Sequence, residues 1–334
     1  MAHLIKNSHI SRCVSIFALL ALLLGGCRAE EAAPQQVQGF ALDTLITVTA
    51  YGKADPAVLQ GCLGLCSEYE LVFSRTNEDS ELYRLNAAGG GTVSEPMREV
   101  LETALRYCAL SGGRFDITMG GVSALYGFSS QTPSVPTEAE LAEAMTHVGY
   151  EKLVLEGNEL TITDPGTVID LGAIAKGYIA DRMKDYLLAN GVEHALLSLG
   201  GNIVCVGGKA DGAPFRVGVQ YPEAGSRETV AVLETADGSV VTSGVYERAF
   251  TRDGVTYHHL LSSVTGRPIA NGLLSVTIVA DRSVDADALS TAVFALGLEE
   301  GMALLDSLDG VCGMLLTEDL TQHCSQGFAD LLAD

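Results

Sequence analysis

The chain has 334 residues, of which 47% are hydrophobic and 19% charged, so it can bury a sizeable core and wholesale disorder is excluded. It has 20 Lys and Arg against 42 Asp and Glu, which gives a formal charge of −22. This excess of acid argues against general nucleic-acid binding, which depends on basic side chains that neutralise phosphates. At roughly 100–200 residues per domain, the length allows one large domain or two ordinary ones.

The first 26 residues are typical of a secretory signal peptide, because Lys6 and Arg12 precede an apolar run over residues 14–24 and no acidic residue is present. The run is shorter than the roughly 20 apolar residues that span a bilayer. It ends in Leu24-Gly-Gly-Cys27, which resembles the lipobox of bacterial lipoproteins. There the signal is cut before the cysteine, whose thiol is lipidated and whose new N-terminus is acylated. The alternative is an ordinary secretion signal with a coincidental cysteine.

We therefore expect Cys27 to anchor an extracytoplasmic protein to the cell membrane, or to an inner membrane on its periplasmic side. Residues 28–38 are small and polar and indicate a tether. Helical and strand patterns are mixed after residue 38, with no linker and no fixed-period repeat. We predict a signal peptide at 1–26, a lipidated cysteine and tether at 27–38, and a single large α+β domain at 39–334, with twisted sheets packed by helices.

The first predicted elements of this domain are a strand at 40–51, from its alternation, and a helix from Pro56 to Phe73, from its apolar spacing. A second helix is predicted at 95–110. A third begins at Thr137, where Glu140 completes a capping box. The remaining predicted elements, in chain order, are a hairpin at 152–163, a strand at 167–171, a helix at 173–189, strands near 194–199, 215–220, 229–235 and 239–242, a hairpin at 249–261, a strand at 273–280, helices at 286–296 and 299–307, and a strand at 311–316.

Six cysteines follow Cys27, and an exported protein could pair them in disulfides. Cys62 and Cys66, however, lie one helical turn apart among apolar neighbours, and Cys205 and Cys312 lie in apolar strand-like runs. Because a free cysteine behaves as a small hydrophobe, we favour buried thiols over disulfides. No paired CxxC spacing is present, which argues against a cysteine-based zinc site.

Two segments have side chains suited to binding ions. Asp170-Leu-Gly-Ala-Ile-Ala-Lys176 leads from a predicted strand into a helix, whose free N–H groups and lysine favour an anion. A plain strand-to-helix turn with a solvated lysine is the alternative. Asp287 and Thr291 lie four residues apart, so they share one helix face and offer oxygen ligands suited to Mg²⁺. Alternatively, Asp287 only places a negative charge at the helix start.

His258 and His259 are adjacent on a predicted strand, so their side chains face opposite sides. One of them can enter a site while the other faces solvent. A lone histidine in a strand is usually structural or exposed, but the nearby Gly266-Arg-Pro268 turn raises the chance of a site.

Together with other motifs, these segments resemble the bacterial FAD:protein FMN transferases of the ApbE family over nearly all of residues 40–297. Each motif alone is modest, but their order behind a lipobox is specific. The motifs are Leu42-Asp-Thr44, Phe73-Ser-Arg75, Asp79-Ser-Glu-Leu82 with Asn86, Gly113-Arg-Phe-Asp-Ile-Thr118, Asp170-Leu-Gly-Ala-Ile-Ala-Lys-Gly177, Leu199-Gly-Gly-Asn202, Thr242-Ser-Gly244, His259 with Thr265-Gly266, and Asp287-Ala-Leu-Ser-Thr291.

The resemblance implies a Mg²⁺-dependent enzyme that cleaves the pyrophosphate of FAD, esterifies FMN through its phosphate to a Thr or Ser hydroxyl of a target protein, and releases AMP. The implied targets include subunits of membrane-bound redox complexes. It further implies that the Ala173 carbonyl, Asp287 and Thr291 hold the cation, and that His259 accepts the proton of the target hydroxyl. The implied flavin contacts are Leu42, Thr76, Arg114, Phe115, Asp116, Asp170, Lys176 and the Leu261 backbone.

Three positions depart from the family pattern. The family usually has Met in place of Leu42 and often an aromatic residue in place of Thr76. It usually has Ile-Ile-Asp-Pro in place of Leu260-Leu-Ser-Ser263, so a possible orienting carboxylate is missing at Ser262. Two other functions stay open: a Mg²⁺-dependent FAD pyrophosphatase that yields FMN and AMP, and a non-catalytic flavin-storing or solute-binding lipoprotein. The cation pair and His259 argue against a purely binding role.

Overall fold

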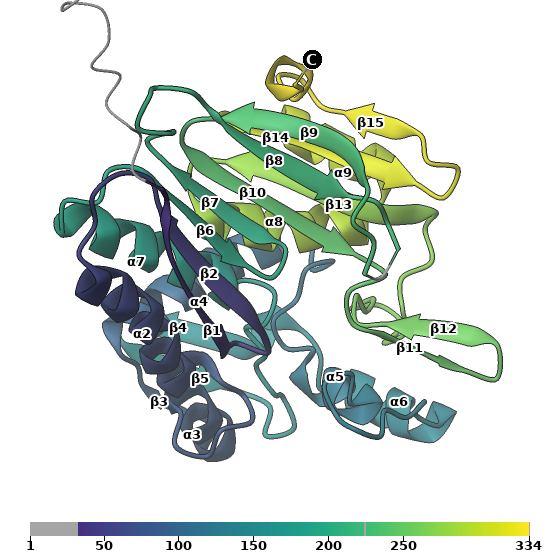
Figure 1. Ribbon diagram of the computed structural model, residues 1–334. Helices are drawn as coiled ribbons and strands as arrows, with labels where there is room; N and C mark the ends of the chain where they lie inside the picture. Colours follow the sequence, from purple (N-terminus) through teal and green to yellow (C-terminus); the bar gives the residue numbers. More distant parts are fainter. Residues whose placement is uncertain (1–32, 224, 334) are drawn as a thin grey trace, which may run out of the picture. The chain divides into compact units, whose positions relative to one another are not determined.

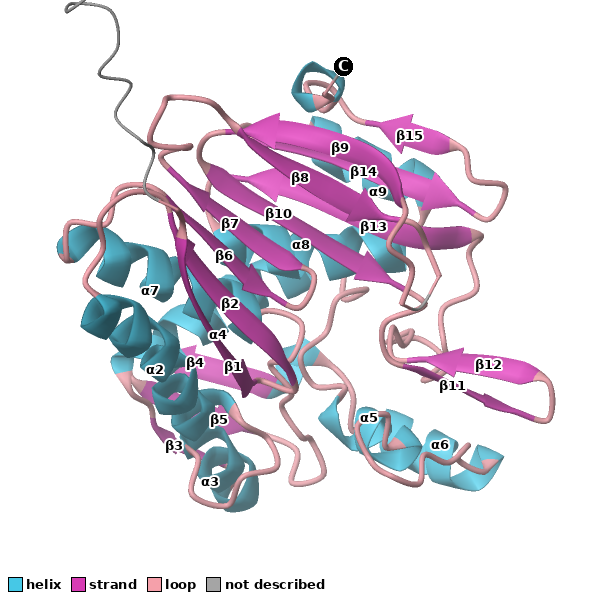
Figure 2. Cartoon of the chain, viewed as in Figure 1, coloured by secondary structure: helices cyan, strands magenta, loops and turns pink. Residues whose placement is uncertain are grey.

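The structure, a computed structural model, describes residues 33–223 and 225–333, and Figures 1 and 2 show the arrangement of their helices and strands. The predicted signal peptide and Cys27 lie outside the described residues. None of the helices within these two ranges is both long and apolar enough to cross a membrane.

The strands are β1 (Gln35–Ala41), β2 (Thr44–Ala50), β3 (Gly90–Thr92), β4 (Leu153–Glu156), β5 (Glu159–Ile162), β6 (Ala195–Leu199), β7 (Asn202–Val206), β8 (Phe215–Gln220), β9 (Thr229–Thr235), β10 (Gly238–Gly244), β11 (Ala249–Arg252), β12 (Val255–His258), β13 (Leu273–Ala280), β14 (Val311–Thr317) and β15 (Gln322–Cys324). The α-helices are α2 (Pro56–Phe73), α3 (Glu81–Ala88), α4 (Glu95–Leu110), α5 (Gly120–Tyr126), α6 (Glu138–Met145), α7 (Ala175–Ala189), α8 (Ser283–Leu296) and α9 (Leu298–Asp306).

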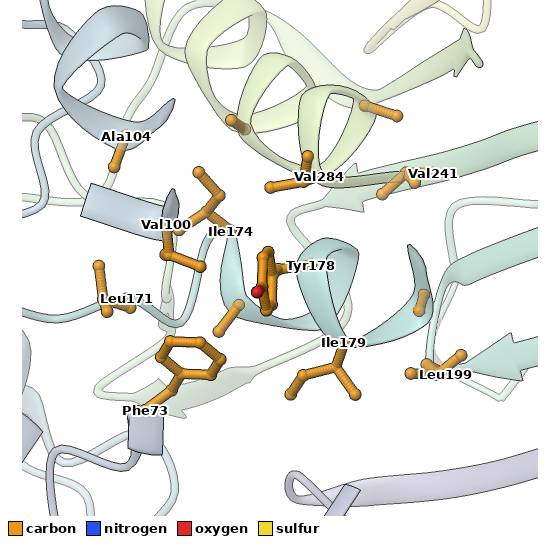
Figure 3. Close-up of a cluster of buried hydrophobic side chains, with 14 of the residues drawn as sticks. Phe73, Val100, Ala104, Leu171, Ile174, Tyr178, Ile179, Leu199, Val241 and Val284 are labelled. Carbon is orange, nitrogen blue, oxygen red and sulfur yellow. The ribbon is translucent and has the colours of Figure 1, made fainter. Parts of the chain in front are cut away.

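An eight-stranded antiparallel sheet in the order β1-β2-β6-β7-β10-β13-β14-β15 organises the fold. Both of its faces are covered at the central strand β10. Val241 of β10 packs into the large core with helices such as α2, α4, α7 and α8, whereas its neighbour Val240 packs against the β8–β9 hairpin on the other face. Figure 3 shows the core around α7, where Tyr178 and Ile179 meet side chains from neighbouring elements. The predicted α+β class is confirmed.

The predicted strand at 40–51 is a hairpin, because the chain reverses at Leu42 and Asp43, whose φ angles are 54° and 58°. β1 already begins at Gln35, so the expected domain boundary at residue 39 falls inside it. The predicted strand at 167–171 is wrong, since this segment makes only one isolated bridge, between Met119 and Val168. Cys62, Cys66, Cys108 and Cys205 are buried, and all six cysteines of the described residues are free.

A smaller cluster joins α5 and α6 to the β11–β12 hairpin. Tyr126 stacks on Phe128 at 5.2 Å between ring centroids, and Phe250 of β11 stacks on Tyr257 of β12 at 5.4 Å. Phe128 and Phe250 lie 5.7 Å apart and connect the two pairs. Because β12 leads directly into His259, this aromatic cluster supports the segment that carries the candidate base.

The start of α7 packs closely against α8, and Gly177 permits the approach. A Cβ at this position would lie 2.3 Å from the carbonyl oxygen of Ser283 and 2.7 Å from the Cβ of Asp287. Asp181, one turn further along α7, accepts hydrogen bonds from the backbone N–H groups of Ser283 and Val284, at 2.8 and 3.0 Å. The N-terminus of α8 is therefore capped by a carboxylate from another helix.

Replacing Gly177 with alanine should push α7 and α8 apart and lower the free energy of unfolding by about 1–3 kcal/mol, as overpacking does elsewhere. Urea denaturation would measure this change in the free energy of unfolding. Gly64→Ala is the control, because an added Cβ in that exposed turn of α2 meets no atom within 4 Å. Alanine should stabilise that helix by up to about 1 kcal/mol. Equal stability of Gly177→Ala and the wild type would contradict the close packing described here.

Candidate functional site

Asp287, one of the predicted cation ligands, contacts the start of α7. The backbone N–H of Gly177 lies in the first turn of α7 and donates to Oδ2 of Asp287 over 2.8 Å. The Ala173 carbonyl, four residues back, is therefore spared the bond that a regular helix would direct to it. Lys176 extends from the same turn, with its Nζ 3.4 Å from Oδ1 of Asp287.

Thr291 lies one turn after Asp287 on α8, as its spacing predicts. Its Oγ1 is 3.4 Å from Oγ of Ser243, which also contacts Oγ of Ser290 at 2.8 Å. Ser243 belongs to the Thr242-Ser-Gly244 motif at the end of β10, so this motif supports the predicted cation site. A carboxylate, a hydroxyl and a free carbonyl form an oxygen donor set that fits Mg²⁺. Nowhere in 33–223 or 225–333 do three or more His, Cys, Asp or Glu side chains form a metal-binding group, so one carboxylate supplies the charge of this set.

Motif residues without a predicted role hold the turn that precedes α7. Nε of Arg75 lies 3.1 Å from Oδ2 of Asp170, whose Oδ1 accepts the N–H of Gly172 at 2.9 Å. The amide of Asn86 bonds both the N–H and the carbonyl of Ile169, at 2.8 and 2.9 Å. Asp170 is therefore positioned from two sides in a segment without a sheet ladder.

The tip of the β1–β2 hairpin approaches the same region. The N–H of Leu42 donates to Oε1 of Glu70 in the last turn of α2, at 2.9 Å, which holds a left-handed backbone that is uncommon for leucine. Oδ2 of Asp43 lies 3.9 Å from Nη2 of Arg248. Thr76, the other predicted flavin contact of this region, is exposed beside Ser74.

The Gly113–Thr118 turn shows three different environments for its predicted flavin contacts. Arg114 is exposed, whereas Phe115 is buried in the large core. Both carboxylate oxygens of Asp116 are engaged: Oδ1 accepts the N–H and hydroxyl of Thr118, and Oδ2 accepts the N–H of Tyr150. Desolvation raises the pKa of Asp116 against these hydrogen bonds. Asp116 thus shapes the turn, and its flavin contact stays a prediction.

The two adjacent histidines face opposite sides, as alternation predicts. His258 is 8% exposed, its Nε2 lies 3.2 Å from the carbonyl oxygen of Ile269, and its ring meets Phe294 edge-on. The expectation that the second histidine faces solvent is therefore wrong, because it faces the core. His259 is half-buried, and its N–H donates to the Arg248 carbonyl at 3.0 Å.

The His259 ring lies in a positively charged surrounding. Desolvation lowers its pKa to about 3, and the charges of Arg248 and Lys176 contribute. The imidazole is therefore neutral near pH 7. Its Nδ1 is buried and makes no hydrogen bond to any part of the chain that the structure describes.

The loop after His259 is held by a backbone bridge and by a hydrogen bond to another segment. Leu261, whose backbone is a predicted flavin contact, forms an isolated antiparallel bridge with Pro268. The hydroxyl of Ser263 donates to the Gly113 carbonyl at 2.6 Å. This bond connects the loop to the Gly113–Thr118 turn, so the two predicted flavin-binding segments are neighbours.

Glu247 is a candidate site residue to which the sequence analysis gave no role. Although Glu247 is exposed, the surrounding protein desolvates its carboxyl and raises its pKa. Lys176 and Arg248 oppose this rise, and Asp287 adds to it. Its Oε1 lies 3.0 Å from the position that a Cβ of Gly201 would take, so the Leu199–Asn202 motif leaves room for it. Its place three residues after the Thr242–Gly244 motif is the signal that the sequence offers.

A model of the ApbE family matches residues 42–316. The chain belongs to the ApbE family. The matched segment includes every candidate cation, flavin and base residue named above, while Cys27 precedes it.

Two relatives of this ApbE-family chain match it over nearly their full length. The FAD:protein FMN transferases of Treponema pallidum and Vibrio cholerae are each 33% identical to it, over 97% and 93% of this chain and 96% of each relative. The solved flavin transferase ApbE of Vibrio cholerae has a TM-score of 0.81 at 31% identity and covers 90% of this chain and all of its own. The ApbE protein of Thermotoga maritima has a TM-score of 0.83 at 29% identity, with the same coverage. The predicted ApbE-like fold is confirmed.

Proposed function

We propose that the chain is a Mg²⁺-dependent FAD:protein FMN transferase that esterifies FMN through its phosphate to a Thr or Ser hydroxyl of a target protein and releases AMP. Relatives with this activity in their names match it over nearly its whole length. The observation that supports the proposal most directly is the contact between Asp287 and the first turn of α7, because that turn follows the Ala173 carbonyl and Thr291 shares the helix face of Asp287.

A cation bound at this site would explain how an acidic chain can bind an acidic cofactor. Bound Mg²⁺ supplies positive charge to the pyrophosphate oxygens and neutralises charge that develops on them. Lys176 pairs with Asp287 in the structure, and its ammonium group can turn from there to a phosphate oxygen. At a formal charge of −22, the protein repels an anion at long range, so we expect FAD binding itself to depend on Mg²⁺.

His259 is proposed as the general base because its Nδ1 is buried without a hydrogen-bond partner in the described residues and its ring is neutral near pH 7. The acceptor hydroxyl oxygen forms the new bond to the FMN phosphorus, and its proton passes to His259. The bond from that phosphorus to the bridging oxygen breaks, and AMP leaves with that oxygen. The backbone carbonyl of Arg248 accepts the N–H of His259, and this bond positions the backbone from which the imidazole ring extends.

One assay separates this proposal from its alternatives: incubation with FAD, Mg²⁺ and a Thr-containing acceptor domain. Flavin fluorescence on the acceptor in a denaturing gel is the expected result. Free FMN and AMP without a labelled acceptor would indicate a pyrophosphatase instead. Intact FAD would indicate a flavin-binding lipoprotein and would overturn the proposal.

We also propose that the enzyme is a lipid-anchored, extracytoplasmic protein whose acceptor is a subunit of a membrane redox complex. Cys27→Ala should release it from membranes or block its maturation, because the lipobox would lose its thiol. Lipid labelling and membrane fractionation would show this. Cys13→Ala is the control, since that residue leaves with the signal peptide. Unchanged labelling of Cys27→Ala would exclude this anchor.

A further inference from the structure

Asp287 is a buried carboxylate whose two oxygens both have partners in the structure. The residue is 2% exposed, its Oδ2 accepts the N–H of Gly177 at 2.8 Å, and its Oδ1 lies 3.4 Å from Nζ of Lys176. Within the described ranges, Lys176 is the only basic side chain that lies within 4 Å of this carboxylate. Because a buried carboxylate is costly without a compensating charge, the ammonium group of Lys176 acts as its counterion in the structure.

The same carboxylate is the charged member of the proposed cation site. The other two proposed ligands, the Ala173 carbonyl and the Thr291 hydroxyl, are neutral, so Asp287 carries most of the attraction for Mg²⁺. Since Oδ2 of Asp287 accepts the N–H of Gly177, Oδ1 is the oxygen left for a cation, and Lys176 is its partner. An ammonium group and a divalent cation repel each other at such a short range. The two therefore compete for Oδ1.

Lys176 has room to leave Asp287. Its side chain is 24% exposed, against 4% for that of Asp287, and it extends from the first turn of α7 on a flexible four-carbon stem. Its charge also reaches two other site residues, because it lowers the pKa of His259 and opposes the rise in the pKa of Glu247. A turn of this side chain away from Asp287 therefore keeps it within the site.

Glu247 is the second carboxylate in range of Lys176. The charges of Lys176, Arg248 and Asp287 all act on its carboxyl. In the structure the two basic side chains form their ion pairs with other partners, Lys176 with Asp287 and Arg248 with Asp43. The carboxylate of Glu247 can therefore accept an ammonium group that leaves Asp287.

Local contacts place Glu247 beside the start of α8. Its Oε1 lies 3.0 Å from the position that a Cβ of Gly201 would take. The next residue, Asn202, accepts the hydroxyl of Ser283 at 2.8 Å, and Ser283 lies one turn before Asp287 on α8. Glu247 and Asp287 therefore belong to one cluster around the ammonium group of Lys176.

We propose that Lys176 and Mg²⁺ are alternative partners of Asp287, and that Glu247 is a positioning residue that receives the ammonium group of Lys176 when a cation binds. This inference rests on the proposed function, because it concerns the same cation site and the same pyrophosphate. Between Glu247 and a phosphate oxygen of FAD, the released lysine has two anionic partners. Mg²⁺ and FAD should therefore bind cooperatively.

Calorimetric titration of the full-length, detergent-solubilised protein with MgCl₂ alone tests the exchange. Lys176→Met should bind Mg²⁺ roughly tenfold more tightly than the wild type, because Asp287 has lost the competing partner. Arg248→Met is the matched control, since it removes the same charge from the same cluster but its ion pair is with Asp43. It should tighten Mg²⁺ binding by no more than about twofold. Equal tightening in the two variants would indicate general charge repulsion and overturn the exchange, as would unchanged binding in Lys176→Met.

Glu247→Gln tests the receiving carboxylate and keeps the shape of the side chain. It should weaken Mg²⁺ binding roughly three- to tenfold in the wild-type background. In the Lys176→Met background it should change this affinity by less than about twofold, because Glu247 acts through that lysine. A direct ligand of the cation would lose the same affinity in both backgrounds. Equal losses, or no loss in the wild-type background, would rule out the positioning role.

Titration with FAD at saturating Mg²⁺ gives a second test, in which the expected sign is opposite to that of a simple charge effect. Removing a negative charge beside an anionic ligand should by itself tighten binding. We expect Glu247→Gln to weaken FAD binding roughly three- to tenfold instead, because Lys176 is no longer held beside the phosphate. Tighter or unchanged FAD binding would contradict this arrangement.

These binding measurements need no acceptor protein, so they separate this inference from the transfer reaction. If the titrations give the expected results but the wild type labels no acceptor with FMN, the proposed transfer fails and the exchange at Asp287 stands. If the wild type binds no Mg²⁺, the cation site fails and the exchange fails with it.

Discussion

Asp287→Asn should abolish turnover and remove the Mg²⁺ dependence of FAD binding while the protein stays folded. The asparagine oxygen can still accept the N–H of Gly177, so the contact between α7 and α8 is kept. What is lost is the negative charge, and Asp287 supplies the only carboxylate of the proposed donor set. Asp287→Ala should in addition lower stability, because it leaves that N–H without its partner. Calorimetric titration of FAD with and without Mg²⁺ measures the first effect, and urea denaturation the second.

Asp285→Asn is the matched control for this charge change. Asp285 lies on the same helix, but its carboxylate pairs with Arg106 at 2.5 Å and accepts the hydroxyl of Tyr107 at 2.8 Å, away from the proposed ligands. Its variant should bind FAD with the Mg²⁺ dependence of the wild type. The cation assignment would be wrong if Asp287→Asn retained that dependence, or if Asp285→Asn lost it.

His259→Ala should slow flavin transfer by roughly 10²–10⁴-fold while FAD and Mg²⁺ still bind. The reason is that a base acts on the acceptor's proton and contributes nothing to the affinity of the cofactor. Because the pKa of His259 is lowered, its ring is already neutral near pH 7, so acidification to about pH 5 should not imitate the mutation through this residue. Single-turnover transfer at saturating FAD measures the effect.

His258→Gln tests which of the two histidines points into the site. Glutamine can still donate to the Ile269 carbonyl, which limits damage to the packing against Phe294. This variant should lose far less activity than His259→Ala. A large loss in His258→Gln together with near-normal transfer in His259→Ala would reverse the assignment.

Elements with strong local signals could be predicted from the sequence. Helix α2 and helix α4 have the predicted bounds, and the capping box of Thr137 and Glu140 is present. The strand predicted at 273–280 also has its predicted bounds as β13. These elements follow residue spacing or residue type within a few positions, so no distant contact is needed to recognise them.

Elements that depend on distant residues were misjudged. Helix α8 begins at Ser283, three residues before its predicted start, because Asp181 of α7 caps it. The turn at Leu42 and Asp43 lacks a glycine, and a contact from Glu70 of α2 holds it. In both places the decisive hydrogen-bond partner is distant in sequence.

The fold class, the family and the candidate residues can be recognised from the sequence, because residue types at fixed spacings persist whatever the rest of the chain does. Asp287 and Thr291 share a helix face by spacing alone. The contacts that these residues make with other elements follow from the tertiary packing. It places Gly177 of α7 against Asp287, directs His258 to the core, and sets Glu247 where Lys176 and Asp287 influence it. Such encounters depend on how closely two packed elements approach, and that distance is set by side chains from many parts of the chain.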